Sequence, residues 1–322
     1  NDTINGGGGN DLIIGGNGND SIDAGVGHDV IYGGNGNDVI YTNAYNGTMA
    51  HTLGDTIDGG TGNDYIVSSS GHDLIFGGSG ADTIISVYGQ DTINGGWGND
   101  KIELAWGDGF LFGDNGDDTI YGGNGSCYIK GGNGHDQIDT GWGLDTVEGG
   151  NGNDLIYAQK YGFVIADGGA GNDTISSAID AFGGTGDDVL VGKSNLYQSE
   201  DDAEIRLNGG AGNDKLYTGT VAHNVLIGGS GSDIFIFSFA GTWSGDPVSA
   251  TVKDFHQSQH DVLNFHEVFD GKMDLTTFLH EYAVQSGQDV VINIDEAPGR
   301  TEFNVVLKNV NIANLQASDF IF

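Results

Sequence analysis

The chain has 322 residues, of which 60 are glycine and 2 are proline, so it lacks the proline of collagen-like or proline-rich sequences. Asp and Glu number 46 against 10 Lys and Arg, and the formal net charge of −36 excludes electrostatic binding to nucleic acid or to an anionic membrane surface. The single cysteine excludes an intrachain disulfide and a Cys-based zinc site. Without a run of 18 apolar residues, no membrane-spanning helix is expected.

A nine-residue repeat fills most of the chain. Its pattern, Gly-Gly-x-Gly-x-Asp-x-apolar-x, starts at residue 6, recurs from 15, 24 and 33, runs without a gap from 59 to 166, and continues loosely from 168, 183, 209 and 228. The glycines predict a tight turn, and the apolar eighth position predicts a short strand with one inward side chain. One strand cannot bury that face alone, so we expect the units to stack into a coil. Residues 1–5 look like the tail of a further unit, and we expect the chain to be the C-terminal piece of a longer one.

A second period of 18 residues indicates two strands and two turns per coil. From residue 59 onward, the full glycine pattern appears only in alternate units, while the units between them drift to sequences such as Leu104-Ala105-Trp106. Alternate turns therefore fall on opposite edges of a two-sheet roll. One edge keeps the pattern and the other varies.

Aspartates form a column on the edge that keeps the pattern. Asp82, Asp100 and Asp118 follow one another at intervals of one coil, and adjacent strands lie about 4.8 Å apart. Two carboxylates at that distance repel by roughly 3 kcal/mol at an effective dielectric of about 20. A hard cation held by carboxylate and carbonyl oxygens would remove the repulsion, and Ca²⁺ suits such flexible oxygen sites better than Mg²⁺. The alternative is that Asp at this position only favours the turn.

These repeats resemble the RTX (hemolysin-type calcium-binding) repeat family over residues 1–236, with interruptions at 42–58, 177–182 and 192–208. The resemblance implies an all-β fold, a right-handed parallel β-roll of about 18 residues per coil, in which position-six aspartates and turn carbonyls bind multiple Ca²⁺ ions. By match to position six, the implied metal ligands are Asp11, Asp20, Asp29, Asp38, Asp64, Asp82, Asp100, Asp118, Asp136, Asp154, Asp173, Asp188, Asp214 and Asp233.

The edge whose turns depart from the glycine pattern is expected to bind metal less well. Asp73, Asp91 and Asp145 keep the acidic position with incomplete glycines and are weaker candidates for metal ligands. Gly109 and Cys127 replace the aspartate in their units, which should empty or weaken those turns.

Aromatic residues occupy the third position of several turns on the same edge, namely Tyr88, Trp106 and Trp142. Stacked aromatic rings on a rigid coil are candidates for binding the sugar rings of a glycan. The alternative is that they pack on one another and join the coils where calcium is missing.

The last part of the chain, residues 237–322, lacks the nine-residue repeat and has a different residue pattern. Strands are predicted at 234–237, 262–265, 289–294 and 303–310, and an amphipathic helix is predicted after Asp274 as N-cap. These elements predict a small C-terminal β-rich cap with one short helix, which an open coil end requires. Asp254-Phe255, Asp261-Val262-Leu263 and the terminus at 318–322 resemble the C-terminal target domain of type I secreted proteins, which implies recognition by the type I secretion machinery.

We found no catalytic motif in the sequence. Neither His-Glu-x-x-His nor Gly-x-Ser-x-Gly occurs, so we expect no catalytic residue in this chain. The leading hypothesis is a calcium-dependent folding and export module of a secreted bacterial protein, located outside the cell or on its surface. The alternatives are a polysaccharide-binding, adhesin or surface-layer module that uses the aromatic residues, and the C-terminal part of a secreted enzyme or toxin.

Overall fold

The fold is all-β, a parallel β-solenoid of about 18 residues per turn, as the sequence predicts. The computed structural model describes residues 1–42, 54–159, 162–193, 204–219, 223–237, 248–269, 271–294 and 303–322. The chain divides into two compact units, Asn1–Val164 and Ile165–Phe322.

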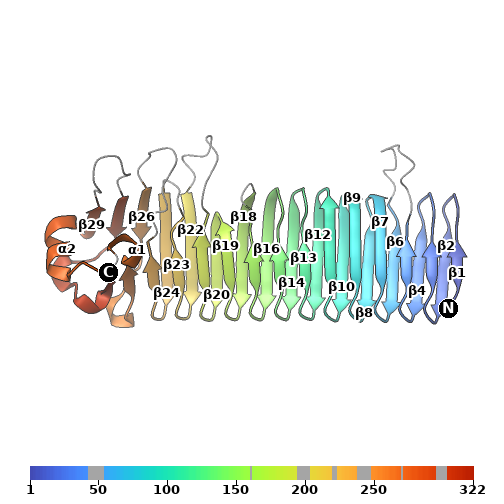
Figure 1. Ribbon diagram of the computed structural model, residues 1–322, viewed down its shortest axis with the longest axis horizontal. Helices are drawn as coiled ribbons and strands as arrows, with labels where there is room; N and C mark the ends of the chain where they lie inside the picture. The colour runs from blue at the N-terminus through green and yellow to red at the C-terminus, as the bar shows by residue number, and fades with distance from the viewer. Residues whose placement is uncertain are drawn as a thin grey trace. The chain divides into compact units, whose positions relative to one another are not determined.

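Two parallel sheets form the first unit, and the chain alternates between them at every turn (Figure 1). The strands of one sheet are β1 (Thr3–Asn5), β3 (Ser21–Asp23), β5 (Val39–Tyr41), β7 (Tyr65–Gly71), β9 (Thr83–Gly89), β11 (Lys101–Trp106), β13 (Thr119–Tyr121), β15 (Gln137–Asp139) and β17 (Leu155–Tyr157). Those of the other sheet are β2 (Leu12–Asn17), β4 (Val30–Asn35), β6 (Thr56–Thr61), β8 (Leu74–Ser79), β10 (Asp91–Trp97), β12 (Gly109–Asn115), β14 (Cys127–Asn133) and β16 (Leu144–Asn151).

Aliphatic side chains at position eight form the core between the two sheets. Ile84, Ile102 and Ile120 are register partners in successive coils, and Ile75 and Ile93 are partners in the facing sheet. All five are fully buried. Because β-branched side chains suit a pleated and buried surface, one inward residue per strand repeated along the ladder builds a continuous core. This confirms the inward position that the repeat predicts.

The predicted interruption at 42–58 is too long at its C-terminal end. Ile57 lies in β6, pairs with Ile31 of β4 and is fully buried, so residues 56–58 belong to the roll. The prediction was wrong there because it relied on the missing glycines, whereas the strand depends only on the inward Ile57 between two outward residues. Residues 43–53 lie outside the described residues.

The second unit continues the same construction with less regular turns. One sheet contains β19 (Thr174–Ala178), β21 (Val189–Gly192), β23 (Lys215–Tyr217), β25 (Ile234–Ile236), β27 (Val262–Asn264) and β31 (Phe320–Ile321). The other contains most of β18 (Phe163–Ala170), which begins at the end of the first unit, and β20 (Asp180–Thr185), β22 (Glu204–Ala211), β24 (His223–Ser230), β26 (Val248–Val252), β30 (Phe303–Leu307), β29 (Asp289–Ile294) and β28 (Ala283–Ser286).

Two further interruptions are predicted in this unit. At 177–182 the turn is merely short, because β20 begins two residues after β19 ends, and Ser177 has a positive φ of 66°. Of the stretch 192–208, residues 194–203 lie outside the described part of the chain, and β22 starts at Glu204. Parallel pairing also continues past residue 236, since β25 pairs with β27, and the predicted boundary there stays a prediction.

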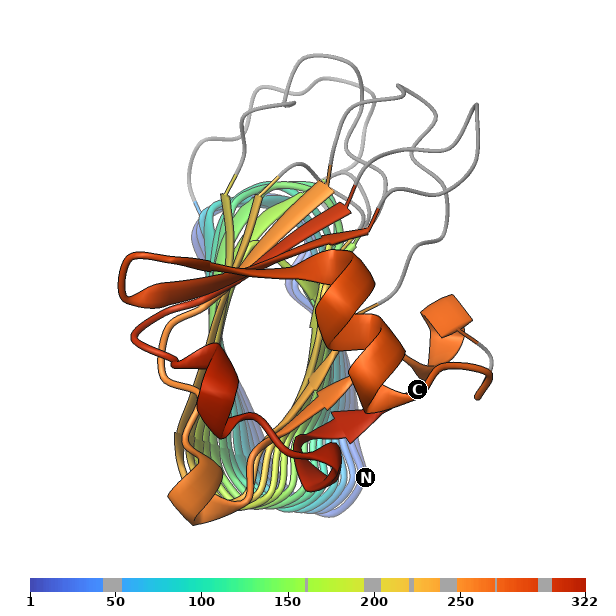
Figure 2. The same ribbon diagram turned by 90° about the vertical axis from the view of Figure 1, so that its left-hand side faces the viewer.

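A small aromatic core closes the end of the second unit. Helix α1 (His266–Phe269) and helix α2 (Leu275–Tyr282) lie there with the β28–β29 hairpin, as Figure 2 shows. Asp274 caps α2 by accepting the N–H of Thr277, which confirms the predicted helix and its N-cap. The rings of Phe265 and Phe278 lie 5.3 Å apart and those of Phe278 and Phe322 5.0 Å apart. Among the described residues, no helix has the length and apolarity needed to cross a membrane.

Candidate metal sites

The turns that precede the aspartates require glycine because successive coils approach each other closely. Gly60, at position two of its turn, has a φ of 105°. A Cβ on it would lie 2.0 Å from the carbonyl oxygen of Gly34 in the preceding coil. The same relation recurs at Gly78, whose Cβ would lie 2.1 Å from the carbonyl oxygen of Gly60. The turn edge is therefore lined by backbone carbonyls with no side chains between them.

A ladder of hydrogen bonds holds one oxygen of each aspartate along the column. The backbone N–H of Asp64 donates to Oδ1 of Asp82, that of Asp82 to Asp100, and that of Asp100 to Asp118, each at 2.7 Å. These side chains are almost completely buried. In the first unit the ladder connects the predicted residues Asp20, Asp38, Asp64, Asp82, Asp100, Asp118, Asp136 and Asp154.

The other oxygen, Oδ2, is buried and points at the first glycine of its own turn. A Cβ on Gly59 would lie 2.6 Å from Oδ2 of Asp64 and 2.6 Å from the carbonyl oxygen of Gly77 in the next coil. On Gly77 it would lie 2.6 Å from Oδ2 of Asp82 and from the carbonyl oxygen of Gly95. In these two turns, a carboxylate oxygen and a carbonyl oxygen of the neighbouring coil thus lie close to the same point beside the first glycine.

Many of these Oδ2 atoms accept no hydrogen bond within the described part of the chain. Leaving a buried carboxylate oxygen without a partner is costly. Oxygens are the ligands that hard cations such as Ca²⁺ prefer, at about 2.3–2.6 Å, so the residues present fit calcium. The Oδ2 atoms concerned belong to Asp11, Asp20, Asp29, Asp38, Asp64, Asp73, Asp82, Asp100, Asp118, Asp136, Asp145, Asp188, Asp214 and Asp233.

Burial raises the pKa of the aspartates in the column. It raises the pKa of Asp64 and Asp118 to about 7 and that of Asp82, Asp100 and Asp136 to about 6. For Asp64 and Asp118, the carboxylates in the neighbouring coils raise the pKa further. Backbone N–H donors oppose the shift without cancelling it. Without a bound cation, the ionised form of these buried carboxylates is therefore disfavoured at neutral pH.

The second unit has its own column, which ends differently. The N–H of Asp173 donates to Asp188 and that of Asp188 to Asp214, each at 2.8 Å, and the ladder continues through Asp233 to Asp261. Oδ2 of Asp261 accepts the N–H of His256 at 2.7 Å, so the last carboxylate is satisfied by the protein. The sequence prediction did not include Asp261 in the column, although its Asp-Val-Leu sequence matches positions six to eight.

On the opposite edge of the first unit a second ladder runs through Asp11, Asp29, Asp55, Asp73 and Asp91. The sequence prediction missed Asp55 because the insertion before it breaks the spacing. The Asp-Thr-Ile sequence at 55–57 was the signal that identifies it. Burial raises its pKa to about 6, as in the first column.

Turns on this edge fill the space beside the aspartate in other ways. The hydroxyl of Ser86, at position one, donates to Oδ2 of Asp91 at 2.5 Å. Where Gly109 replaces the aspartate, the side chain of Leu104 takes the space, since a Cβ on Gly109 would lie 2.7 Å from it. Cys127 donates its S–H to the carbonyl oxygen of Gly122 at 3.2 Å. Gly109 and Cys127 leave position six of their turns without a carboxylate.

The aromatic residues of this edge are exposed. Tyr88 and Trp106 are register partners in adjacent strands, and 41% and 53% of their surfaces are accessible. Trp142 is 55% exposed. Although Tyr88 and Trp106 are both described, no contact between their rings is present.

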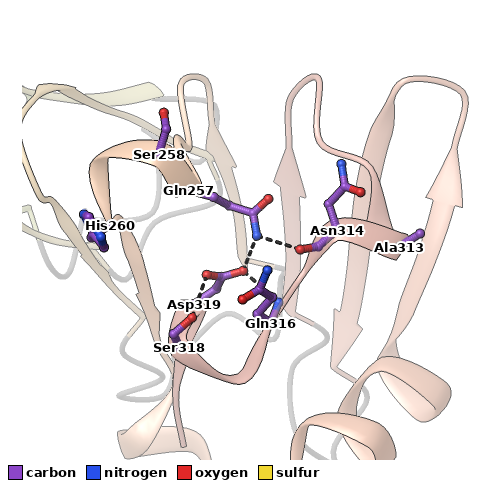
Figure 3. A pocket seen from close by; sticks show the side chains of 8 residues that line it. All are labelled: Gln257, Ser258, His260, Ala313, Asn314, Gln316, Ser318 and Asp319. Atoms are coloured by element: carbon purple, nitrogen blue, oxygen red, sulfur yellow. Dashed lines mark hydrogen bonds between the residues drawn. The ribbon is translucent and has the colours of Figure 1, made fainter.

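A polar hollow in the second unit is held together by its own hydrogen bonds (Figure 3). The side-chain amide of Gln257 donates to the carbonyl oxygen of Asn314 at 2.8 Å and to Asp319 at 2.5 Å. The backbone N–H of Gln316 also donates to Asp319, at 2.8 Å. These bonds fasten the 3-10 turn η1 (Gln257–Gln259) to the C-terminal segment. The described residues contain no cluster of three or more His, Cys, Asp or Glu side chains around a shared point.

The parallel solenoid and its columns of buried aspartates define a protein whose turns present carboxylate and carbonyl oxygens coil after coil. The chain belongs to the RTX calcium-binding nonapeptide repeat family. The model of that family matches residues 1–31, 14–48, 52–84, 76–111, 104–138, 128–156 and 162–181, which together make up more than half of the chain.

Comparison with solved structures finds the extracellular lipase LipA from Serratia marcescens. It is 20% identical, with a TM-score of 0.19, and the match covers 67% of this chain and 40% of the lipase. The chain therefore spans less than half of the lipase's length. No curated protein matches the chain.

Proposed function

We propose that this chain is a calcium-dependent folding and export module of a secreted protein. The observation that carries the proposal is the series of buried Oδ2 atoms, several of which, such as those of Asp64, Asp82 and Asp118, lie close to a carbonyl oxygen of the next coil. Calcium, when bound, supplies positive charge that neutralises these carboxylates. The ligands would be the fourteen position-six aspartates with the carbonyls of their turns, while Asp73, Asp91 and Asp145 would bind more weakly. Of the fourteen, Asp11 and Asp29 lie on the opposite edge of the first unit.

The aspartates and glycines make folding depend on the ion. A net charge of −36 opposes compaction, and the raised pKa values show that the folded column disfavours ionised carboxylates. The chain would therefore stay unfolded where calcium is scarce, as in a cytosol, and fold where calcium is plentiful. Weak extracellular calcium modules bind at about 10⁻⁴–10⁻³ M, which suits a switch that operates outside the cell.

Export is the second part of the proposal. An unfolded acidic chain is suited to passage through a narrow secretion channel, and the segment 237–322 would be recognised by the type I secretion machinery. Whether the chain is joined to a secreted enzyme or toxin is a separate hypothesis, in which catalysis would belong to another part of the protein.

A calcium titration of the full chain tests the folding proposal. In buffer treated with a chelating resin at pH 7.5, we expect a circular dichroism spectrum without strand signal. Adding Ca²⁺ to millimolar concentration should produce the strand signal cooperatively, and Mg²⁺ at the same concentration should not. A complete strand signal in the calcium-free buffer would contradict the proposal.

A further inference from the structure

Two hollows adjoin on the surface of the first unit. They share Tyr121, Gly123 and Asn124 as lining residues, and each is bordered by one tryptophan, Trp106 or Trp142. Asn124 forms isolated parallel β-bridges with both tryptophans, which lie in the flanking coils. The two indoles are therefore two coils apart, about 9.6 Å from the strand spacing. This is comparable with the length of two pyranose rings linked end to end.

Two glycines line the hollows. Gly123 and Gly141 have φ values of 69° and 72°. A Cβ on Gly123 would lie 1.8 Å from the carbonyl oxygen of Leu104, and one on Gly141 would lie 1.9 Å from that of Gly123. Leu104 is fully buried beneath this surface. Close packing of the coils therefore requires glycine here, and the depression follows from it.

The opposite wall combines a ring with polar groups. Glu103, Tyr121 and Asp139 are register partners on successive strands. Lys101 lies 3.5 Å from Glu103 and 5.8 Å from the centre of the Tyr121 ring. The amide of Gln159 donates to both carboxylate oxygens of Asp139, at 2.8 and 2.9 Å. Aromatic faces and hydrogen-bonding groups thus alternate around the hollows.

We propose that these two hollows bind a neutral, linear polysaccharide. The exposed rings would stack on the apolar faces of the sugars, while Glu103, Asn124 and Asp139 would form hydrogen bonds with the hydroxyl groups. Ligand sites commonly combine apolar contacts with a few polar groups in this way. A linear polymer matches this surface because the two tryptophans lie at equivalent positions two coils apart along the solenoid. The carboxylates of Glu103 and Asp139, which line the hollows, would repel an anionic glycan.

The test compares two tryptophan variants in the full, calcium-loaded chain. Trp106→Ala with Trp142→Ala removes both rings of the site. Trp97→Ala is the matched control, because Trp97 is 68% exposed and occupies the same third position of a turn on the other edge. Affinity electrophoresis in gels containing hydroxyethyl cellulose, arabinoxylan or galactomannan, with alginate as the anionic comparison, measures binding.

We expect at least one neutral polysaccharide to slow the electrophoretic migration of the wild type and of Trp97→Ala equally. The double variant should bind at least about tenfold more weakly, the loss expected when central aromatic contacts are removed. Its calcium-titration midpoint by circular dichroism should not change, which separates binding from folding.

Three results would overturn the proposal. They are no retardation by any neutral polysaccharide, retardation by alginate alone, and equal retardation of the wild type and the double variant. Sedimentation velocity adds a fourth. Self-association of the wild type that the double variant loses would show that a second copy of the chain, and not a glycan, covers the hollows.

Discussion

Within each turn, the first residue is matched to the sixth. Glycine at position one leaves room for the aspartate Oδ2, as at Gly113, where a Cβ would lie 2.3 Å from Oδ2 of Asp118. At Ser86 a hydroxyl donates to that oxygen instead, and Leu104 occupies the space where the aspartate is missing. Position one therefore leaves room for a buried carboxylate oxygen, donates a hydrogen bond to it, or fills the space where the carboxylate is absent.

Replacing Asp118 with Asn tests this at one position. The amide oxygen still accepts the N–H of Asp100, while the charge disappears and an N–H₂ group comes near the carbonyl oxygen of Gly131. We expect the variant to show more strand signal than the wild type in calcium-free buffer at pH 7.5. It should also bind fewer calcium ions by isothermal titration calorimetry.

Asp117→Asn is the control for that change. Asp117 is the exposed neighbour of Asp118, and its Oδ1 accepts the N–H of His135 at 2.8 Å, which an asparagine preserves. Its calcium stoichiometry and its calcium-free spectrum should match those of the wild type. If the two variants behave alike, the role given to the buried Oδ2 is wrong.

Among the elements, the ladders of position-eight residues hold the strands in register. Ile120 pairs with Ile102 and Ile138 in the neighbouring coils and is fully buried. Shifting one strand by a residue would turn its inward side chain to solvent. The aliphatic ladder therefore fixes which carboxylate faces which turn.

Truncating one member of the ladder should weaken the roll without changing the ligands. We expect Ile120→Ala to lower the free energy of unfolding by about 2–5 kcal/mol, measured by urea denaturation in saturating calcium. Thr119→Ala, on the outward neighbour, should cost far less. Equal losses for the two variants would mean that the core does not carry the stability assigned to it.

For the molecule as a whole, the raised pKa values predict an unusual response to pH. The folded values of about 7 for Asp64, Asp118 and Asp188 exceed the ordinary value of about 3.9. Between these limits the calcium-free folded chain binds more protons than the unfolded chain, so its stability falls as pH rises from about 4 to 7.

Circular dichroism in resin-treated, calcium-free buffer checks this expectation. Strand signal should be greater at pH 4.5 than at pH 8. With calcium present the trend should reverse, because protons compete with the ion for the same oxygens and acidification below about 6 should raise the calcium concentration needed for folding. A calcium-free chain equally unfolded at both pH values would show that protons cannot replace the cation.

Spacing along the chain was enough to predict the coil, its inward aliphatic residues, the helix after Asp274 and most of the aspartate ladder. These features follow from local periodicity, since a period of two sets the strand faces and glycine sets the turns. Prediction failed at Asp55 because an insertion hides the register, and Asp261 carries the same Asp-x-apolar signal without the glycines.

Only the tertiary structure decides which groups meet across coils. The sequence contains Gly77, Gly95 and Ser86, but it does not say which oxygen lies beside which turn. The groups that lie beside Asp82 and Asp91 depend on how the coils stack. A single insertion in the chain changes which residues pair in every later coil. The partner of each buried oxygen, and the depression between Trp106 and Trp142, arise from that stacking, because contacts between coils join residues far apart in the chain.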